Sequence, residues 1–304
     1  MSIPFIGFDE GEALADWRDL AAALRDGHQR PRAEIGDTFL YRDHDTLLSR
    51  AAWIDGMGAA VKTATIFPGN AAPLTTINGA VSLFDDDTGT LAAMIDFHLV
   101  TKWKTAGDSL LGALHLARDD SRSILILGAG TVAASLIEAF SAGFPGTTFA
   151  IWNRSPSRAA ALANSVENTV AVTDLPAAVD AADIILGATM TTDPILHGDW
   201  LRPGQHVNLI GAYRADMREA DDRVLARSNI YVDSISTTLD HIGELKIPLA
   251  TGAITREDVI ADFYNLDRFD RAGADTITVF KNGGGAHLDL MTSRYLLDQW
   301  RAAQ

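Results

Sequence analysis

The chain has 304 residues, of which 47% are hydrophobic and 8% aromatic, enough to bury a full core in one large domain or two smaller ones. Its 40 Asp and Glu outnumber its 25 Lys and Arg, and the resulting formal charge of −15 argues against a nucleic-acid partner, because a phosphate backbone would be repelled. The absence of cysteine excludes disulfides and zinc–thiolate sites. The sequence shows neither an apolar run of membrane-spanning length nor a secretory leader, so we expect a cytoplasmic protein with no membrane partner.

The first part of the chain predicts an α+β module. Apolar residues at helical spacing predict a helix over residues 11–27. Short runs bounded by turn signals then predict five strands, at residues 37–41, 45–52, 58–66, 77–84 and 91–95. A stretch rich in Ala and Leu predicts a long helix over residues 96–118, which leads out of this module.

Residues 123–140 carry the motif around which the chain is organised. Four aliphatic residues lead directly into Gly128-Ala-Gly130, and apolar residues at helical spacing follow, so the stretch predicts a strand, a tight turn and a helix. In this G-x-G-x-x-A spacing Gly128 permits the turn, Gly130 lets a pyrophosphate approach the backbone, and Ala133 lets the helix lie close to the strand. A second predicted strand at residues 148–152 completes a βαβ unit, so we predict a dinucleotide site rather than a bare glycine turn.

The end of that second strand indicates which dinucleotide binds. An NAD-specific site usually has a carboxylate here that binds the ribose hydroxyls. This chain instead continues with Asn153, Arg154, Ser155 and, further on, Arg158, which offer donors and positive charge to a 2′-phosphate. We therefore predict NADP(H) as the preferred cofactor and NAD(H) as a second possibility; the alternative is that both arginines are merely solvated at a helix start.

After residue 152 strands continue to alternate with helices, which predicts a parallel sheet with helical crossovers. The expected strands are at residues 169–172, 184–187, 205–210 and 230–232, with helices near 176–182 and 221–226. Ligands lie outside the carboxyl ends of such strands, although ordinary loops are an equally good interpretation for any single residue there. The segments at these ends supply the remaining predicted cofactor contacts, which are Thr131, Val132, Thr189, Met190, Gly211, Lys281 and Asn282.

Beyond residue 243 the pattern becomes irregular, and residues 288–303 predict a final amphipathic helix that packs back on the first module. The whole pattern predicts an α/β fold, with a Rossmann-type doubly wound parallel sheet plus a discontinuous α+β domain. We expect residues 1–112 with 288–304 to form the discontinuous domain, and residues 113–287 to form the NAD(P)-binding domain.

Two lysines interrupt apolar or small surroundings in the first module. Strand alternation places Lys62 on the same face as Ala60 and Ala64, and Lys104 falls in the first turns of the long helix. An anionic substrate needs such cations, although most lysines are solvated and Asp108 is a simple ion-pair partner for Lys104. The eight histidines show no metal-ligand spacing, and the chain has neither a nucleophile elbow nor a phosphate-binding P-loop. Hydride transfer without a metal is therefore the best-supported chemistry.

Several segments together resemble the ornithine cyclodeaminase and mu-crystallin family, over roughly residues 30–295. They are residues 63–70 (TATIFPGN), 89–96 (GTLAAMID), Thr101 with Thr105-Ala106, the Gly128-Ala-Gly130 turn, Asn153-Arg154 and 279–282 (VFKN). The resemblance implies a homodimer whose discontinuous domain dimerises and binds substrate. It also implies that Lys62 meets the substrate carboxylate at the imine centre and that Arg32 supplies a second carboxylate contact.

Two positions depart from the family's pattern. Lys104 stands where the family usually has arginine, so a point charge replaces a bidentate fork. Tyr213 stands where cyclodeaminases carry an aspartate, and a neutral phenol is a poor substitute for a carboxylate in the proton transfers that accompany ammonia loss. Members with this variation are usually imine reductases. The resemblance thus implies NADPH-dependent reduction of a small cyclic imino acid, of the Δ1-pyrroline-2-carboxylate or Δ1-piperideine-2-carboxylate type.

In this interpretation Lys62 and Tyr213 are catalytic. Lys62, Arg32, Lys104 and Asp289 bind the substrate, with His287 as a weaker supporting candidate. Two alternatives remain from the sequence: an NAD-dependent ornithine cyclodeaminase that forms proline and ammonia, and a catalytically silent protein that binds NADPH and a carboxylate ligand.

Overall fold

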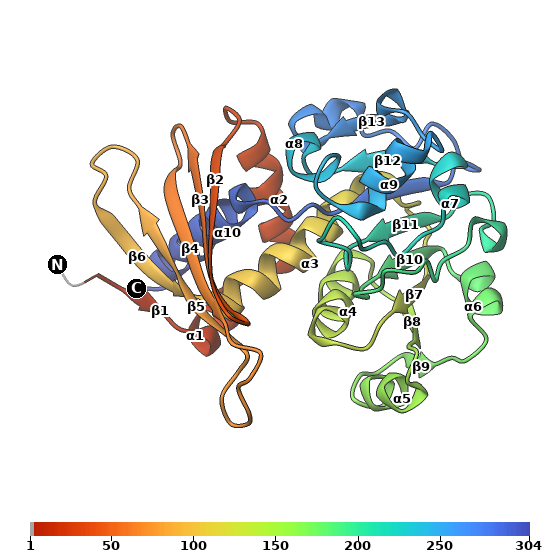
Figure 1. The fold of residues 1–304 in the computed structure, drawn as a ribbon, viewed down its shortest axis with the longest axis horizontal. Helices are drawn as coiled ribbons and strands as arrows, with labels where there is room; N and C mark the ends of the chain where they lie inside the picture. The colour runs from red at the N-terminus through yellow and green to blue at the C-terminus, as the bar shows by residue number, and fades with distance from the viewer. Residues whose placement is uncertain (1–2) are drawn as a thin grey trace. The chain divides into compact units, whose positions relative to one another are not determined.

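A computed structural model describes residues 3–304, which form two compact units (Figure 1). Unit 1 contains the residues through Gly107 together with Gly285–Gln304, and unit 2 contains Asp108–Gly284. The divisions fall a few residues before the positions expected from the sequence. The first lies within the long helix α3 (Phe97–Leu116), and the second immediately precedes α10 (Ala286–Ala302).

Unit 1 is built on a six-stranded sheet with the order β1-β6-β5-β4-β3-β2. Its strands are β1 (Phe5–Ile6), β2 (Glu34–Arg42), β3 (Asp45–Ile54), β4 (Gly58–Ile66), β5 (Ile77–Phe84) and β6 (Leu91–Asp96). All neighbours pair antiparallel except β1, which runs parallel to β6. The five strands expected from turn signals are therefore confirmed, and β1 is an additional short strand.

Helices cover one face of this sheet. The single helix expected over residues 11–27 is wrong, because the structure has α1 (Phe8–Leu14) and then α2 (Trp17–His28). Asp16 separates them, since its carboxylate accepts the N–H groups of Arg18 and Asp19 and so caps a new helix. The final helix α10 packs on β3, β4 and α2, as expected (Figure 1). Its approach to α2 is close, and a Cβ on Gly27 would lie 2.6 Å from the sulfur of Met291.

Unit 2 is an eight-stranded parallel sheet with the order β13-β12-β14-β11-β10-β7-β8-β9. Its strands are β7 (Ser123–Leu127), β8 (Thr148–Trp152), β9 (Thr169–Ala171), β10 (Ile184–Gly187), β11 (His206–Leu209), β12 (Asn229–Val232), β13 (Val259–Asp262) and β14 (Thr278–Lys281). The crossovers carry α4 (Thr131–Gly143), α5 (Pro156–Asn164), α6 (Leu175–Ala181), α7 (Asp222–Ala226), α8 (Ile235–Thr238), α9 (Gly243–Thr251) and the short 3-10 turns η1 (Gly198–Trp200), η2 (Arg256–Asp258) and η3 (Phe263–Arg268). This arrangement confirms the predicted Rossmann-type sheet.

The region beyond residue 243 is regular, contrary to the expectation from its sequence. It contributes α9, β13 and β14, and β14 lies inside the sheet between β12 and β11. The pattern is hidden because β14 is only four residues long and carries Thr278 and Lys281 at fully buried positions. Helix α9 contains Pro248 and has no amphipathic stripe.

The core of unit 2 fixes where a ligand can bind. The central strands β7, β10 and β11 are almost wholly buried, with Leu125, Ile185 and Val207 fully enclosed. Such strands bury both faces under helices, so polar chemistry is left to their ends. No helix within residues 3–304 is both long and apolar enough to cross a membrane.

Candidate active site

A buried cluster of two lysines and one aspartate lies in unit 1. Lys62 comes from β4, Lys104 from α3 and Asp289 from α10, and none of the three is more than 6% exposed. The Nζ atoms of Lys62 and Lys104 lie 3.0 and 2.9 Å from the same atom, Asp289 Oδ1. Three segments that are far apart in the sequence therefore converge on one carboxylate oxygen.

Local structure explains why the two lysines point inward. Alternation along β4 directs Lys62 to the buried face with Ala60 and Ala64, as predicted. The Lys62 ammonium also donates to Thr101 Oγ1 at 3.0 Å and lies 4.6 Å from the centre of the Phe97 ring. Both partners belong to α3, and Lys104 is one turn after Thr101 on the same helix.

Lys104 pairs with Asp289, a carboxylate that comes from another helix. Asp108, the partner suggested by helical spacing, is also buried and accepts a hydrogen bond from Asn282 Nδ2. Asp289, a supporting candidate in the sequence, is thus the centre of the cluster.

The cluster carries a net positive charge. Arg50 on β3 lies directly opposite Lys62 in the β3–β4 ladder and pairs with Asp37 at 2.9 Å. Three cations, Lys62, Lys104 and Arg50, thus face two carboxylates. Residue spacing did not indicate Arg50, because only the strand register brings it beside Lys62.

Burial and charge shift the ionisation of the cluster. Burial lowers the pKa of Lys104 to about 8, against the opposing charge of Asp289. Burial alone would raise the pKa of Asp289, but the neighbouring Lys104 and Lys62 outweigh it and lower that pKa. Burial, together with the charges of His28 and Lys104, holds the pKa of His287 well below its ordinary value, so this side chain is neutral at physiological pH. The site therefore attracts an anion through its lysines, not through histidine.

Arg32 and Tyr213 are exposed in the structure. Arg32 lies between α2 and β2, outside the buried cluster. Tyr213 follows β11 in unit 2 and is 58% exposed. The Cζ atom of Arg214 lies 5.7 Å from the centre of its ring. Neither side chain is held in a buried polar network of the kind that holds Lys62.

The glycine turn of unit 2 has the geometry that a pyrophosphate needs. Gly128 has φ +123°, and a Cβ there would lie 2.6 Å from the carbonyl oxygen of Ala188, so only glycine fits. Gly130 is the N-cap of the 13-residue helix α4, and within residues 3–304 no side chain caps that helix start. The first N–H groups of α4, from Thr131 and Val132 onward, are thus available to an anion.

The end of β8 presents two arginine side chains and the start of helix α5. Arg154 and Arg158 are both exposed, and Ser155 is the N-cap of α5. Asn153 donates from Nδ2 to the carbonyl oxygen of Ser155 at 3.0 Å, which fixes the turn that presents these groups. Residues 153–158 contain no carboxylate that would repel a phosphate.

The remaining predicted cofactor residues fall into two groups. Thr189, Met190 and Gly211 lie in the loops that follow β10 and β11, and Met190 is 73% exposed. Lys281 and Asn282 are buried, and their contact with the cofactor stays a prediction. Their polar atoms are used inside the protein, because the polar end of β14 lies between two other strands.

The partners of these two residues show what they do instead. Lys281 Nζ donates to the carbonyl oxygens of Leu209 at 3.0 Å and Ala212 at 2.7 Å. Asn282 accepts from Asn208 Nδ2 at 2.6 Å. Both side chains therefore hold the end of β11, and Lys281 also holds the loop that follows it.

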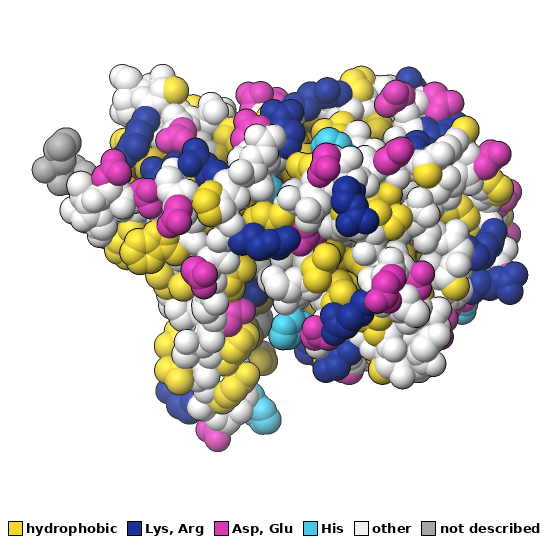
Figure 2. Space-filling view, turned by 90° about the horizontal axis from the view of Figure 1, so that it is seen from above, with side chains coloured by type: hydrophobic (Ala, Val, Ile, Leu, Met, Phe, Trp, Pro, Cys, Tyr) yellow, Lys and Arg dark blue, Asp and Glu magenta, His cyan; other side chains and the backbone are white. Residues whose placement is uncertain are grey.

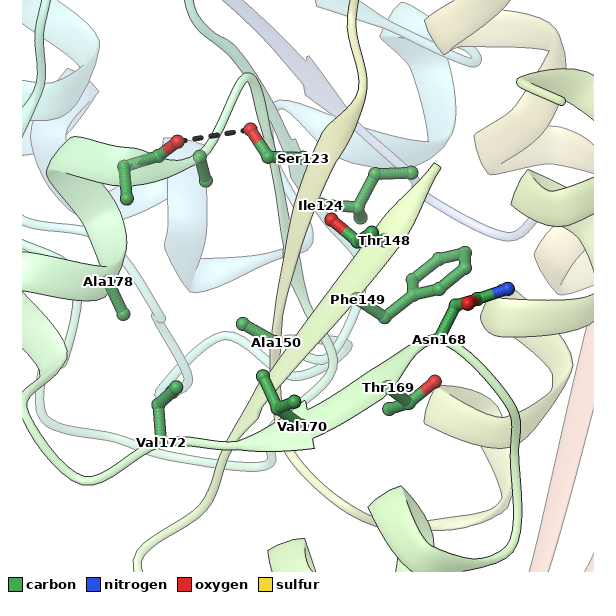
Figure 3. A pocket seen from close by; sticks show the side chains of 12 residues that line it. Ser123, Ile124, Thr148, Phe149, Ala150, Asn168, Thr169, Val170, Val172 and Ala178 are labelled. Atoms are coloured by element: carbon green, nitrogen blue, oxygen red, sulfur yellow. Dashed lines mark hydrogen bonds between the residues drawn. The ribbon is translucent and has the colours of Figure 1, made fainter. Parts of the chain in front are cut away.

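A pocket of unit 2 lies at the amino ends of its strands, at the edge of the sheet opposite the glycine turn (Figure 3). Ser123, Thr148 and Thr169 line it at the starts of β7, β8 and β9, and most of its other lining residues are apolar. Because the glycine turn is at the carboxyl end of β7, this pocket is not the dinucleotide site. Among the side chains of residues 3–304, no group of three His, Asp or Glu is placed to hold a metal ion.

Known proteins show similarity over most of the chain. The sequence model of the ornithine cyclodeaminase/mu-crystallin family matches residues 44–304. A Δ(1)-pyrroline-2-carboxylate reductase of Paracoccus denitrificans is 52% identical over 301 residues, which cover 96% of this chain and 95% of that protein. The ketimine reductase mu-crystallin of Rattus norvegicus is 35% identical over 227 residues, covering 74% of this chain and 70% of that protein.

Solved structures show the same fold. The Δ(1)-pyrroline-2-carboxylate reductase of Thermococcus litoralis, in complex with NADH and L-proline, matches with a TM-score of 0.89 at 22% identity and covers 99% of this chain and 98% of its own. The iminosuccinate reductase of Paracoccus denitrificans, in complex with NAD⁺, also matches with a TM-score of 0.89 at 22% identity and covers 99% of this chain and 97% of its own.

Substitution of Asp289 tests the cluster. Asp289→Asn leaves two buried ammonium groups without their carboxylate, so we expect the free energy of unfolding to fall by about 3 kcal/mol in urea denaturation. Asp298→Asn, on the exposed side of the same helix, is the control and is expected to change stability by less than about 0.5 kcal/mol. Equal stabilities of the two variants would contradict the central place given to Asp289.

Proposed function

The chain belongs to the ornithine cyclodeaminase/mu-crystallin family, and from this premise we propose that it reduces a small cyclic imino acid with NADPH. The expected substrate is of the Δ1-pyrroline-2-carboxylate or Δ1-piperideine-2-carboxylate type, and the product is the cyclic amino acid. The observation that carries the proposal is the buried, positively charged cluster around Asp289. The names of the similar reductases support the same reaction class.

The cluster suits a substrate with one carboxylate. The Lys62 and Lys104 ammonium groups are buried, so their attraction for an anion is weakly screened. Charge-assisted hydrogen bonds from both to one carboxylate would neutralise the excess positive charge of the site. Thr101 and Phe97 hold Lys62 in place before the substrate arrives, which reduces the entropy lost on binding.

Reduction of an imine requires a hydride at carbon and a proton at nitrogen. A bound dihydronicotinamide supplies the hydride. In this proposal Lys62 Nζ, or a water molecule, gives a proton to the imine nitrogen, because a protonated imine is the better hydride acceptor. Asp289 Oδ2 accepts no hydrogen bond from any residue between 3 and 304, so it is available to an N–H of the protonated ring. This pairing would stabilise positive charge at nitrogen during the reaction.

We also propose NADPH as the preferred cofactor. The support is the pair of exposed arginines, Arg154 and Arg158, at the end of β8, together with the lack of a carboxylate in residues 153–158. A 2′-phosphate would gain charge-assisted hydrogen bonds there, whereas NADH offers only hydroxyl groups.

We further propose a homodimer in which the outer faces of two unit 1 sheets meet. Opposite the α10 side, the sheet presents Leu40, Leu47 and Trp53, of which Leu40 is 60% and Trp53 56% exposed. They adjoin an apolar groove lined by Ala51, Val61 and Phe84 among others. Figure 2 shows hydrophobic side chains gathered on the protruding part of unit 1. A second copy of the chain offers the same apolar face, so the contact is self-complementary.

Turnover decides the function. With Δ1-pyrroline-2-carboxylate or Δ1-piperideine-2-carboxylate, we expect the purified protein to consume NADPH, measured by its absorbance. Lys62→Ala is expected to lower kcat/KM at least about 100-fold while the affinity for NADPH stays unchanged. Lys102→Ala is the control, because Lys102 is the neighbouring helix lysine that pairs with Glu12. Tight NADPH binding without turnover would indicate a silent binding protein, and ammonia release from ornithine would indicate a cyclodeaminase.

The pH dependence tests the role of Lys104. Since its pKa is lowered to about 8, the ammonium form is lost as the pH rises through that value, and carboxylate binding weakens. We expect kcat/KM for the imino acid to fall about tenfold per pH unit above pH 8. Lys104→Arg keeps its charge and should move this fall to higher pH. The substrate's own ionisation is common to both proteins, so identical pH profiles would refute the assignment.

Substitution of Arg154 tests the cofactor preference. Arg154→Ala removes a charged donor to the 2′-phosphate, so we expect KM for NADPH to rise about tenfold or more while KM for NADH changes little. Arg122→Ala, at the amino end of β7, is the control. An equal rise for both cofactors, or for neither, would count against the proposed phosphate site.

Light scattering tests the dimer. The chain has a mass of 32.6 kDa, and we expect the unaltered protein to scatter as about twice that mass. Trp53→Lys places a charge in the apolar face and should give the monomer mass with unit 1 still folded. A dimer unaffected by Trp53→Lys would show that another surface is used.

A further inference from the structure

A second buried polar network, in unit 2, lies behind the loops that follow β10 and β11. Its centre is Glu219, whose fully buried carboxylate accepts three hydrogen bonds. Oε1 accepts from the backbone N–H and from the hydroxyl of Thr189, both at 2.7 Å. Oε2 accepts from the N–H of Gly211 at 2.6 Å. One side chain thus joins the loops of two neighbouring parallel strands.

The two loops touch at the point that Glu219 holds. A Cβ on Gly211 would lie 1.8 Å from the carbonyl oxygen of Thr189. A Cβ on Gly187, the last residue of β10, would lie 2.9 Å from Glu219 Oε1. No side chain fits at either position, so the loop backbones pack directly on each other and on the carboxylate. A change at Glu219 must therefore move both loops.

Glu219 is itself held by buried groups. Glu244 at the start of α9 accepts the N–H groups of Glu219 at 2.7 Å and Ala220 at 2.9 Å. Burial raises the pKa of Glu219 and raises that of Glu244 to about 7, while the charge of Lys281 opposes both shifts. Lys281 also donates to the end of β11 and its loop, as described above. Hydrogen bonds from these buried side chains thus connect the ends of β10, β11 and β14.

The strand order shows which half of a dinucleotide these loops would face. The glycine turn follows β7, which lies between β8 and β10 in the sheet. A cofactor with its pyrophosphate at Gly128-Gly130 and its 2′-phosphate at Arg154 has its adenosine half over β8. Its other half then extends over the ends of β10 and β11, where Thr189 and Gly211 lie. This other half is the nicotinamide.

We propose that Glu219 is a positioning residue for the nicotinamide half of the cofactor, acting by clamping the backbones at Thr189 and Gly211 together. Both of its carboxylate oxygens accept hydrogen bonds from Thr189 and Gly211, so it acts on the ring through these two loops. The clamp shapes the surface that the ring lies against. This proposal rests on the proposed function only in requiring that unit 2 binds a nicotinamide dinucleotide.

The test compares two ligands on the full-length protein, NADPH and 2′-phospho-ADP-ribose, which lacks the nicotinamide. In Glu219→Gln one carboxylate oxygen becomes an NH₂ group, so a donor faces either Thr189 or Gly211 in place of an acceptor. We expect the Kd for NADPH, measured by calorimetry, to rise about tenfold, and the Kd for 2′-phospho-ADP-ribose to stay within about twofold. An unchanged NADPH affinity, or an equal loss for both ligands, would overturn the proposal.

Two further variants separate positioning from general destabilisation. Asp262→Asn alters another buried carboxylate of unit 2, at the end of β13, and should leave both affinities unchanged. Glu244→Gln is the milder change if Glu219→Gln does not fold, because it leaves the Glu219 carboxylate in place and disturbs the support of the backbone at Glu219 and Ala220. We expect the affinity of this variant for NADPH to fall about threefold while its affinity for 2′-phospho-ADP-ribose stays unchanged. If the affinity for NADPH does not fall selectively, the proposal is overturned.

Because the readout is binding, it is separate from the test of the reaction. A protein that binds NADPH but reduces no imine would disprove the proposed function, and the comparison of the two ligands would still decide the role of Glu219.

Discussion

The chemistry proposed for this protein depends on one carboxylate oxygen, Asp289 Oδ1, which receives two buried ammonium groups. Without it, Lys62 and Lys104 would be buried like charges with no counter-ion between them. With it, two carboxylates face three cations and the site as a whole remains positive. A helix from the end of the chain thereby supplies the counter-ion for lysines on β4 and α3, which come much earlier in the sequence.

The same constraint explains why unit 1 is discontinuous in sequence. Helix α10 packs against β3, β4 and α2, and Asp289 lies in its first turn, where a carboxylate is favoured by the helix dipole. Without α10, unit 1 would lose both the cover of its sheet and the counter-ion of its lysines. Folding and ligand binding in unit 1 therefore share one element.

Unit 2 uses buried charge differently. Around Asp289 the excess charge is positive and suits an incoming anion, whereas Glu219, Glu244 and Lys281 use their polar atoms on backbone groups. Such satisfied networks fix the positions of loops at the ends of parallel strands. One unit thus provides charge for a ligand, and the other provides a rigid backbone surface.

Features that depend on local order could be predicted from the residues alone. The glycine turn between β7 and α4, strands β2 to β12 and the inward direction of Lys62 follow from residue spacing, because periodicity and glycine conformation act over a few residues. The family resemblance, carried by short segments in order, added the reaction class.

Which charged residues meet was set by the three-dimensional fold. Arg50 is brought beside Lys62 by the strand register, Lys104 meets Asp289 from another helix, and Glu219 is one of several buried carboxylates, singled out by its hydrogen bonds to two loops. Lys281 resembled a ligand contact in the sequence but is enclosed because β14 lies within the sheet. The physical reason is the same in each case: the ionisation and partners of a charged side chain depend on burial and on neighbours that are distant in sequence, and residue spacing carries no record of either.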